Sequence, residues 1–393
     1  MLNNETASAG VSTTILVDRG PTFVSIAEDI RKIMNARQQK PNFEYGRTRI
    51  PLNVPTYGSA EVIEALDSLM TTWVTMGKKV KAFEEMWAKY CESPIGVMTN
   101  SGSSANLLAL SALKAVGWLK EGDEVITPAL TWATTVFPIA QVGCIPVLVD
   151  VERDTYNINP TAVERAITAK TRVVMPVHLL GNPCDMNNLV RIIQTHNLYM
   201  VEDCCEAHGA EVNGCKVGND GNLATYSFFF SHHISTIEGG MVLGSHPDLI
   251  DACRSMRAFG WIRERSDRKT IAANNPDIDD RFLFHTPGFN FRPTEVQGAF
   301  GMHQLPRLEG FIEIRRENAA YWNKELAQYG DWLELQAEQP NTRHVWFAYP
   351  MLVREGVPFT AKELMAYLER RGVECRPIEA GNMALQPAMK EIN

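Results

Sequence analysis

The stretch that decides the fold is Ile95-Gly96-Val97-Met98-Thr99-Asn100-Ser101-Gly102-Ser103-Ser104-Ala105-Asn106. Its first five residues form a short apolar run typical of a buried strand, and a turn of small residues then leads into a helix from Ala105 onward. Free backbone N–H groups at a helix start bind phosphate, and glycine lets the backbone approach a ligand closely. A serine before a helix is also a common N-cap, so this stretch alone leaves phosphate binding and simple capping as alternatives.

Short apolar runs and helical patterns alternate through the following 150 residues. Strands are predicted at residues 95–99, 125–127, 145–151, 172–179, 198–201, 224–230 and 241–244, with helices between them that include residues 136–141, 161–167 and 186–196. Such alternation predicts a parallel sheet covered by helices on both faces. The apolar character of the runs fits strands buried on both sides. The fold class is therefore α/β, with a mostly parallel seven-stranded sheet.

The ends of the chain have a different pattern. Residues 1–20 are polar and are expected to form a disordered tail, and apolar spacing predicts helices at residues 23–38 and 59–91. After about residue 300 the sequence predicts a helix at 311–329, a strand at 346–353 and a helix at 360–372. We therefore divide the chain into an N-terminal tail and helix (1–45), a large domain (46–300) and a smaller α+β domain (301–393).

Composition excludes several classes of function. The chain has 46 acidic and 38 basic residues, a formal net charge of −8, and no basic cluster, so we expect no nucleic-acid partner. No apolar run reaches the length of a membrane span, and the N-terminus lacks the pattern of a signal peptide. The eight cysteines form no CxxC pair and no disulfide framework. These features predict a cytoplasmic protein with reduced thiols and no membrane partner.

Two residues at predicted strand ends are suited to holding a planar cofactor. Asp203 follows a buried parallel strand, where open α/β sheets place their ligands, and its carboxylate can hydrogen-bond a protonated heterocyclic nitrogen. Trp132 follows another strand, and its flat ring can stack on a cofactor. An aspartate in a surface turn and a tryptophan in the core are the alternatives.

A pair of histidines, His232 and His233, follows the apolar run that ends at Phe230. Adjacent side chains in a strand-like stretch point in opposite directions, so the two histidines are poor joint ligands and we predict no metal site. A histidine at a strand end can act as a general base because its pKa lies near neutrality. A purely structural histidine is the alternative.

Taken together and in order, these segments resemble the nucleotide-sugar aminotransferases of the aspartate-aminotransferase fold (fold type I) over residues 46–393. The match comprises residues 101–106, 122–128, 202–203, 227–240, 287–295 and 297–299. The resemblance implies an aminotransferase-like fold, a vitamin B6 cofactor and a homodimer. Family members usually continue some tens of residues further, so the expectation is either a truncated chain or a reduced small domain.

The main departure from the family lies at His232, where its aminotransferases carry the lysine that forms an imine with pyridoxal phosphate. No lysine occurs between Lys216 and Lys269. Because histidine cannot form this imine, the resemblance implies pyridoxamine 5'-phosphate or pyridoxal 5'-phosphate held without a covalent bond. The same substitution marks a branch of the family, the 3-dehydratases of nucleotide-linked 4-keto-6-deoxysugars. The likeness is strongest to members acting on GDP-4-keto-6-deoxymannose in colitose biosynthesis, although Phe259 replaces their histidine.

The resemblance implies a lyase that removes the 3-hydroxyl of a nucleotide sugar during deoxysugar and lipopolysaccharide biosynthesis, with glutamate as the amino donor. It implies His232 as the catalytic residue. The implied cofactor-binding residues are Gly102, Ser103, Ser104, Trp132, Asp203, Glu206, Ser227 and Asn290. The implied substrate-binding residues are Lys78, Arg292, Trp261 and Arg376. Asn290 and Arg292 match positions that reach the cofactor phosphate of the partner subunit.

Other functions stay open at this point. CDP- and dTDP-linked sugars are alternative substrates, since the N-terminal helix is more like a sister branch that acts on CDP-sugars. That branch also holds a [2Fe–2S] cluster, which needs four thiolates. Residues 259–265 lack the cysteines that it uses, so we expect no cluster. An aminotransferase would need a lysine at position 232. A non-catalytic B6-fold protein is disfavoured because Ser103, Asp203 and Ser227 are all present.

Overall fold

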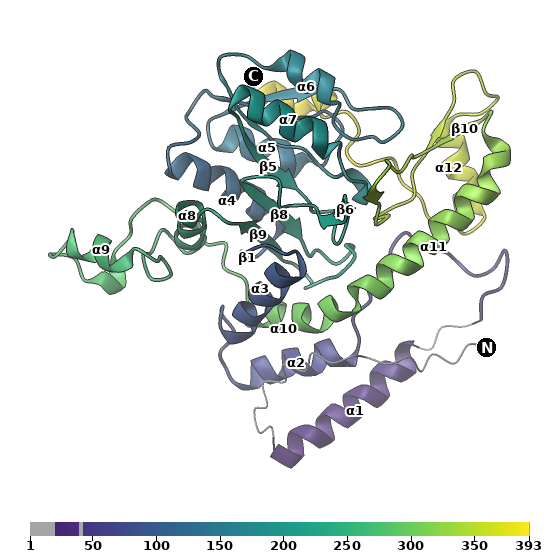
Figure 1. Ribbon diagram of the computed structural model, residues 1–393. Coiled ribbons are helices and arrows are strands. Elements are labelled where there is room, and N and C mark those ends of the chain that lie inside the picture. Colours follow the sequence, from purple (N-terminus) through teal and green to yellow (C-terminus); the bar gives the residue numbers. More distant parts are fainter. Residues whose placement is uncertain (1–19, 39–41, 393) are drawn as a thin grey trace. The chain divides into compact units, whose positions relative to one another are not determined.

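The computed structural model describes residues 20–38 and 42–392 (Figure 1). Residues 20–38 form one helix, α1 (Gly20–Gln38), and belong to a separate unit from residues 42–392. The helix predicted at residues 23–38 is confirmed. The predicted tail lies, apart from Gly20, outside the described residues.

A seven-stranded sheet with the order β1-β9-β8-β5-β4-β2-β3 forms the framework of residues 42–392. Its strands are β1 (Ile95–Thr99), β2 (Glu124–Pro128), β3 (Ile145–Val149), β4 (Thr171–Val174), β5 (Tyr199–Asp203), β8 (Leu223–Ser227) and β9 (Gly240–Gly244). Only β9 runs antiparallel to its neighbours, β1 and β8; all other adjacent pairs are parallel. The predicted mostly parallel sheet is confirmed.

Helices cover both faces of this sheet because neighbouring strand residues point to opposite sides. Val97 and Val125 pack in the core cluster that contains α4 (Gly102–Ala115), α5 (Ala133–Gln141) and α8 (Pro247–Arg257). Met98, the next residue of β1, packs against α3 (Lys78–Tyr90). Ile126, the next residue of β2, packs against α6 (Pro160–Ala166) and α7 (Met186–His196). The result is a three-layer α/β/α arrangement (Figure 1).

The C-terminal part of the chain combines helices with short strands. It contains α10 (Glu295–Gln304), α11 (Leu308–Leu326), β10 (Leu333–Leu335), β11 (Thr342–Arg343), β12 (Met351–Val353) and α12 (Ala361–Arg370). β10 pairs with β12, and β11 pairs with a hairpin of β6 (Glu211–Val212) and β7 (Cys215–Lys216). Thr294 and Thr360 begin α10 and α12 with capping boxes. The helices predicted at 311–329 and 360–372 are confirmed within a few residues at each end.

Four predicted elements differ from the structure. The strand predicted at 172–179 ends at Val174, and Leu179 begins a short 3-10 helix. The helix predicted at 59–91 is two helices, α2 (Ser59–Met70) and α3, because Thr72 adopts a left-handed conformation and Thr75 pairs with Thr294. The strand predicted at 224–230 ends at Ser227, so both histidines lie in a loop. The strand predicted at 346–353 starts only at Met351, because the preceding residues bond to a turn at residues 180–181.

In the part of the chain that the structure describes, every helix is too short or too polar to cross a bilayer. A short helix, α9 (Arg268–Ala273), lies in the segment between α8 and α10. Trp261 stacks on Phe284 within this segment, and the guanidinium group of Arg263 lies over the Trp261 ring, 3.9 Å from its centroid. The segment therefore carries its own small packed cluster.

Candidate active site

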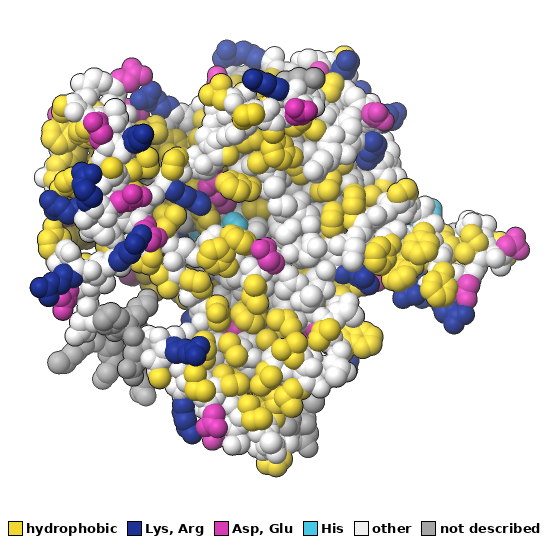
Figure 2. Space-filling view, turned by 180° about the vertical axis from the view of Figure 1, so that it is seen from behind, with side chains coloured by type: hydrophobic (Ala, Val, Ile, Leu, Met, Phe, Trp, Pro, Cys, Tyr) yellow, Lys and Arg dark blue, Asp and Glu magenta, His cyan; other side chains and the backbone are white. Residues whose placement is uncertain are grey.

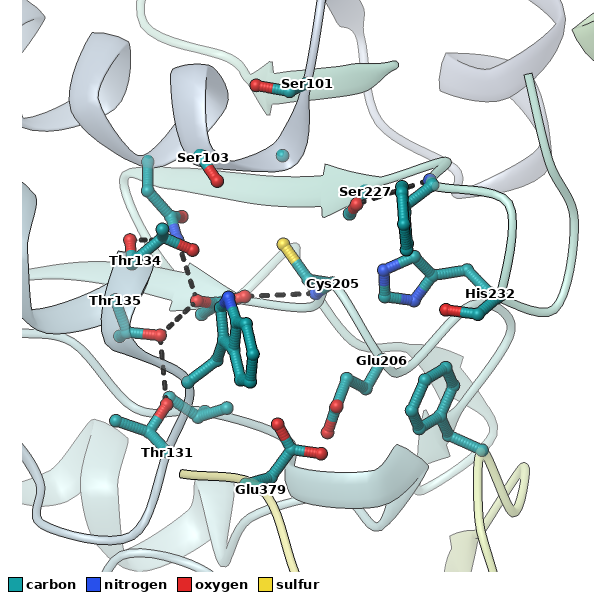
Figure 3. A pocket seen from close by; sticks show the side chains of 18 of the residues that line it. Ser101, Ser103, Thr131, Thr134, Thr135, Cys205, Glu206, Ser227, His232 and Glu379 are labelled. Atoms are coloured by element: carbon teal, nitrogen blue, oxygen red, sulfur yellow. Dashed lines mark hydrogen bonds between the residues drawn. The ribbon is translucent and has the colours of Figure 1, made fainter. Parts of the chain in front are cut away.

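A pocket of about 350 Å³ lies where the parallel strands β1, β2, β5 and β8 end (Figure 3). This is the position at which open α/β sheets bind ligands, and the volume suits a small molecule. Among the residues predicted from the sequence, those that line the pocket are Gly102, Ser103, Trp132, Asp203, Glu206, Ser227, His232 and Arg376. The fold thus brings together residues that lie up to 274 positions apart (Gly102 to Arg376).

Asp203 lies at the base of the pocket with its carboxylate held by three donors. The amide of Asn106 and the hydroxyl of Thr135 both donate to Oδ2 at 2.9 Å, and the backbone N–H of Cys205 donates to Oδ1 at 3.1 Å. Thr225 donates to the amide oxygen of Asn106 at 2.5 Å, which turns the amide nitrogen toward Asp203. These bonds fix the orientation of the carboxylate in the pocket. Asp203 is therefore preorganised to accept a proton-bearing group of a ligand.

The turn between β1 and α4 forms a cradle for an anion beside Asp203. Ser101 caps α4 by accepting from the backbone N–H of Ser104 at 3.1 Å. A Cβ atom on Gly102 would lie only 2.4 Å from the Cβ of Ser227, so glycine is needed for the helix start to approach the end of β8. The hydroxyls of Ser103 and Ser227 border the same space. A helix N-terminus with two hydroxyls is suited to a phosphate group.

His232 lines the pocket from the loop after β8 (Figure 3), and Asp203 lines the same pocket. Its Nδ1 atom is buried and has no hydrogen-bond partner among the described residues. Its ring is surrounded by the rings of Phe347 at 5.1 Å, His208 at 5.8 Å and Phe229 at 6.4 Å between centroids. Burial, followed by the positive charges of Arg376 and Arg315, lowers the pKa of His232 to about 3. The imidazole is therefore neutral near pH 7 and can accept a proton.

Glu206 and Glu379 place two carboxyl groups side by side on the remaining wall (Figure 3). The backbone N–H of Leu180 donates to Glu206 Oε2 at 2.7 Å. Burial and then the carboxyl of Glu379 raise the pKa of Glu206 well above its usual range. Glu379 reaches this position with a φ of 46°, a strained conformation for a residue other than glycine. The raised pKa favours the neutral form of the Glu206 carboxyl.

A model of the DegT/DnrJ/EryC1/StrS aminotransferase family matches residues 56–393. The chain belongs to this family. GDP-4-keto-6-deoxy-D-mannose 3-dehydratase of Yersinia pseudotuberculosis is 38% identical over 336 residues, which cover 84% of this chain and 85% of that protein. The fold is that of the solved structure of E. coli GDP-4-keto-6-deoxy-D-mannose-3-dehydratase with bound hydrated PLP, with a TM-score of 0.80, 33% identity and 89% of each chain covered.

A further solved structure, GDP-4-keto-6-deoxymannose-3-dehydratase with a trapped PLP-glutamate geminal diamine, also has a TM-score of 0.80. It is 33% identical and covers 87% of this chain and 89% of its own. These likenesses confirm the family and the aminotransferase-like fold expected from the sequence motifs.

Five predicted site residues of this family member do not line the pocket. Ser104 contributes its backbone N–H and its hydroxyl to the Ser101 cap. Asn290 accepts from Arg292 Nε at 3.1 Å, and Arg292 covers the ring of Phe259 at 4.6 Å. Lys78 is an exposed residue at the start of α3, and Trp261 packs in the cluster before α9. The expected roles of Asn290 and Arg292 concern a partner subunit and stay predictions.

The second histidine, His233, is structural. Its Nε2 donates to the carbonyl oxygen of Val345 at 3.0 Å, and its Nδ1 lies 3.2 Å from Nδ1 of His208. A different group of potential ligands, His178, Glu202 and Cys204, is buried behind Asp203. Both ring nitrogens of His178 are engaged, one with Glu202 at 3.1 Å and one with the backbone N–H of Cys184 at 3.0 Å. This group is a hydrogen-bonded support for the strand end.

Several residues of the pocket were not predicted from the sequence. Asn106 could have been predicted from helical spacing, because it lies one turn after Gly102 on the same face of α4. Thr135 lies in the turn after Trp132 on α5. Phe347 and Glu379 come from segments without regular structure, and no local pattern indicates them.

Proposed function

We propose that this protein removes the 3-hydroxyl of a nucleotide-linked 4-keto-6-deoxyhexose with the help of pyridoxamine 5'-phosphate, and that GDP-4-keto-6-deoxymannose is its substrate. The observation that carries the proposal is a neutral His232 in the pocket of Asp203, at the position where aminotransferases of the family need a lysine. Its buried Nδ1 has no hydrogen-bond partner among the described residues. The relatives named for this reaction support the choice of substrate.

The pocket fits the cofactor. The carboxylate of Asp203 can accept a hydrogen bond from a protonated pyridine nitrogen, Trp132 can cover the ring, and the Ser101–Ser103 turn with Ser227 can hold the phosphate. When bound, the cofactor supplies an amine for the C4 ketone of the sugar and a ring that accepts electrons as the 3-hydroxyl leaves. Without a lysine at position 232, binding depends on these non-covalent contacts alone.

His232 is proposed to move the proton. Because its imidazole is neutral at pH 7, it can take a proton from the reacting carbon and then assist the departure of the hydroxyl as an acid. A lysine would instead capture the cofactor covalently and return the proton in a simple transamination.

Glutamate is proposed as the amino donor that regenerates the cofactor, as the glutamate adduct in the related structure suggests for that enzyme. We further propose a homodimer in which Asn290 and Arg292 reach the partner's site. Hydrophobic side chains are spread over the face shown in Figure 2, and Trp132 and Phe229 are exposed apolar residues that line the pocket. All eight cysteines are free thiols, which supports a cytoplasmic location.

Mass spectrometry of the nucleotide sugar tests this proposal. The protein is incubated with pyridoxal phosphate, glutamate and GDP-4-keto-6-deoxymannose, and in parallel with CDP- and dTDP-linked 4-keto-6-deoxyhexoses, without any reductase. We expect a 3-deoxy-4-keto product from the GDP-sugar, together with 2-oxoglutarate and ammonia. A 3-deoxy product from another nucleotide would change the substrate, and an amino sugar would identify an aminotransferase. No product from any of the three would support a non-catalytic protein.

A further inference from the structure

One wall of the pocket is formed by a short segment, residues 344–347, which we call the strap. It follows β11 and is tied to the turn at residues 180–181. The N–H of Val345 donates to the carbonyl oxygen of Gly181 at 3.0 Å, and the N–H of Phe347 donates to that of Leu180 at 2.8 Å. Trp346 between them has a φ of 48°. These bonds fix the direction of the strap and turn Phe347 into the pocket.

Arg315 on α11 holds the other edge of the strap. Its Nη1 donates to two successive carbonyl oxygens, those of Trp346 at 3.0 Å and Phe347 at 2.8 Å. No carboxylate lies within ion-pair distance of Arg315 among the residues that the structure describes. Burial lowers the pKa of Arg315. Burying a charge without a counter-ion costs free energy. An arginine at position 315 is therefore expected to serve a role that outweighs this cost.

The neighbouring Arg316 gives a contrast on the same helix. It donates to the carbonyl oxygen of His344 at 2.6 Å and forms an ion pair with Glu338 at 2.8 Å. It therefore ties the start of the same strap, but through an ordinary ion-paired side chain. Of these two arginines, Arg315 bonds the carbonyl oxygen of Phe347, the strap residue that lines the pocket.

The residue presented by the strap is the closest aromatic neighbour of His232. The Phe347 ring centroid lies 5.1 Å from that of His232, and Phe347 also lies 5.8 Å from His233. Because Nδ1 of His232 has no hydrogen-bond partner among the described residues, no polar contact at that atom fixes the ring. Its orientation depends on packing against Phe347, His208 and Phe229.

We propose that Arg315 is a positioning residue for His232: by bonding the carbonyl oxygens of Trp346 and Phe347, it holds the Phe347 ring against the imidazole. This inference rests on the proposed function only in that His232 moves the proton. Proton transfer is sensitive to small displacements, and a shift of about 1 Å caused by a remote change can reduce a rate by about 100-fold. Arg315 does not touch the reacting groups: besides the effect of its charge on the pKa of His232, it acts through the strap.

The test compares Arg315→Met with Arg316→Met in the cofactor-loaded protein. Both changes remove an arginine that ties the strap, so both are expected to lower the melting temperature. In Arg315→Met we expect kcat to fall by about tenfold or more, with KM for the nucleotide sugar changed less than about twofold. In Arg316→Met we expect kcat to stay within about twofold. Arg315→Lys keeps the charge and one donor, and should recover part of the loss.

A second readout does not depend on turnover. In protein with isotope-labelled histidine rings, the NMR signals of His232 are assigned by their loss in His232→Asn. The ring current of Phe347 shifts these signals. We expect Arg315→Met to move them in the same direction as Phe347→Leu does, and Arg316→Met to leave them in place.

Equal losses of kcat in the two arginine variants, or unchanged His232 signals in Arg315→Met, would overturn the proposal and leave Arg315 a structural residue. If no nucleotide sugar is turned over, the proposed function fails, and the NMR comparison still decides whether Arg315 positions the ring. If Arg315→Met does not fold, Arg315→Lys and Phe347→Leu provide the same comparison.

Discussion

The two sides of the pocket are built in opposite ways. On one side, Asp203 is held by hydrogen bonds from Asn106, Thr135 and the backbone of Cys205. On the other side, His232 has a buried nitrogen without a partner among the described residues, and aromatic rings surround it. Donors stabilise a negative charge, whereas burial beside cations destabilises a positive one.

This difference matches the two tasks that the pocket has to perform. A group that keeps a cofactor ring protonated has to stay ionised throughout a reaction cycle, and a fixed set of donors achieves this. A group that takes up and returns a proton has to be neutral at rest, and a hydrogen bond donated by the imidazole to a carboxylate would favour the charged imidazolium instead. Each of the four substitutions below alters a residue on one of these two sides, and they are ordered from the largest expected effect to the smallest.

Replacing His232 with lysine should have the largest effect. The variant is expected to lose 3-dehydration by about 1,000-fold or more, because a lysine links covalently to the cofactor and cannot leave it free. Product formation is followed by mass spectrometry of the nucleotide sugar. His196→Lys, on the exposed face of α7, is the control and should keep normal activity. Dehydration at a normal rate in His232→Lys would refute the role of His232.

Asp203→Asn removes the charge but keeps the shape of the side chain. We expect kcat to fall by about 100-fold or more, the range found when one electrostatic contact to a reacting system is lost. The absorption spectrum of the bound cofactor should also change, because its ring nitrogen loses its carboxylate partner. Asp248→Asn, on the exposed start of α8, provides the control. An unchanged spectrum in Asp203→Asn would contradict the proposed contact.

Thr135→Val removes one of the donors to Asp203 while keeping the volume of the side chain. A hydrogen bond to a charged group contributes about 1.5–3 kcal/mol, so cofactor affinity should weaken by about tenfold or more. Titration of the apoprotein with pyridoxal phosphate, monitored by absorbance, measures this. Thr195→Val, whose hydroxyl bonds only within α7, is the matched control. Equal affinity in both variants would show that Thr135 is dispensable.

Glu379→Gln should change the pH dependence of stability. The pKa of Glu206 is raised in the folded state, so this group binds its proton more tightly when folded. Its contribution to stability is therefore present at low pH and is lost as the pH rises through the folded pKa. Removing the neighbouring carboxyl should make this loss smaller. As the pH rises from 5 to 9, the melting temperature of Glu379→Gln should therefore fall by a few degrees less than that of the wild type. Glu355→Gln, on an exposed turn, should follow the wild type.

Local patterns were sufficient for the sheet and for the strand-end residues. Apolar runs ending in Asp203 or in the Ser101–Ser103 turn combine a buried strand with a polar group at its carboxyl end, and both features are visible in a few consecutive residues. The break between α2 and α3 was missed because apolar residues continue through it. It depends on a bridge from Thr75 to Thr294 and on the backbone N–H of Lys79 bonding Glu295, contacts that span more than 200 residues.

The wall of the pocket that contains Phe347 and Glu379 could not be predicted, because it too depends on contacts that no local pattern reveals. Phe347 faces His232 because the strap bonds to Leu180, Gly181 and Arg315, which come from three distant parts of the chain. Glu379 depends on a strained backbone conformation that its own sequence does not favour. The donors to Asp203 lie nearer in sequence to recognised motifs, and helical spacing would have indicated Asn106.

The most direct test of the central claim is reduction of the cofactor-loaded protein with borohydride, followed by measurement of the intact protein mass. Borohydride fixes a covalent link between a protein amine and pyridoxal phosphate. We predict that the wild-type mass stays unchanged and that His232→Lys gains the mass of one pyridoxyl phosphate group. A pyridoxyl adduct on the wild-type protein would show that another lysine anchors the cofactor, and would contradict the proposal that His232 leaves it without a covalent bond.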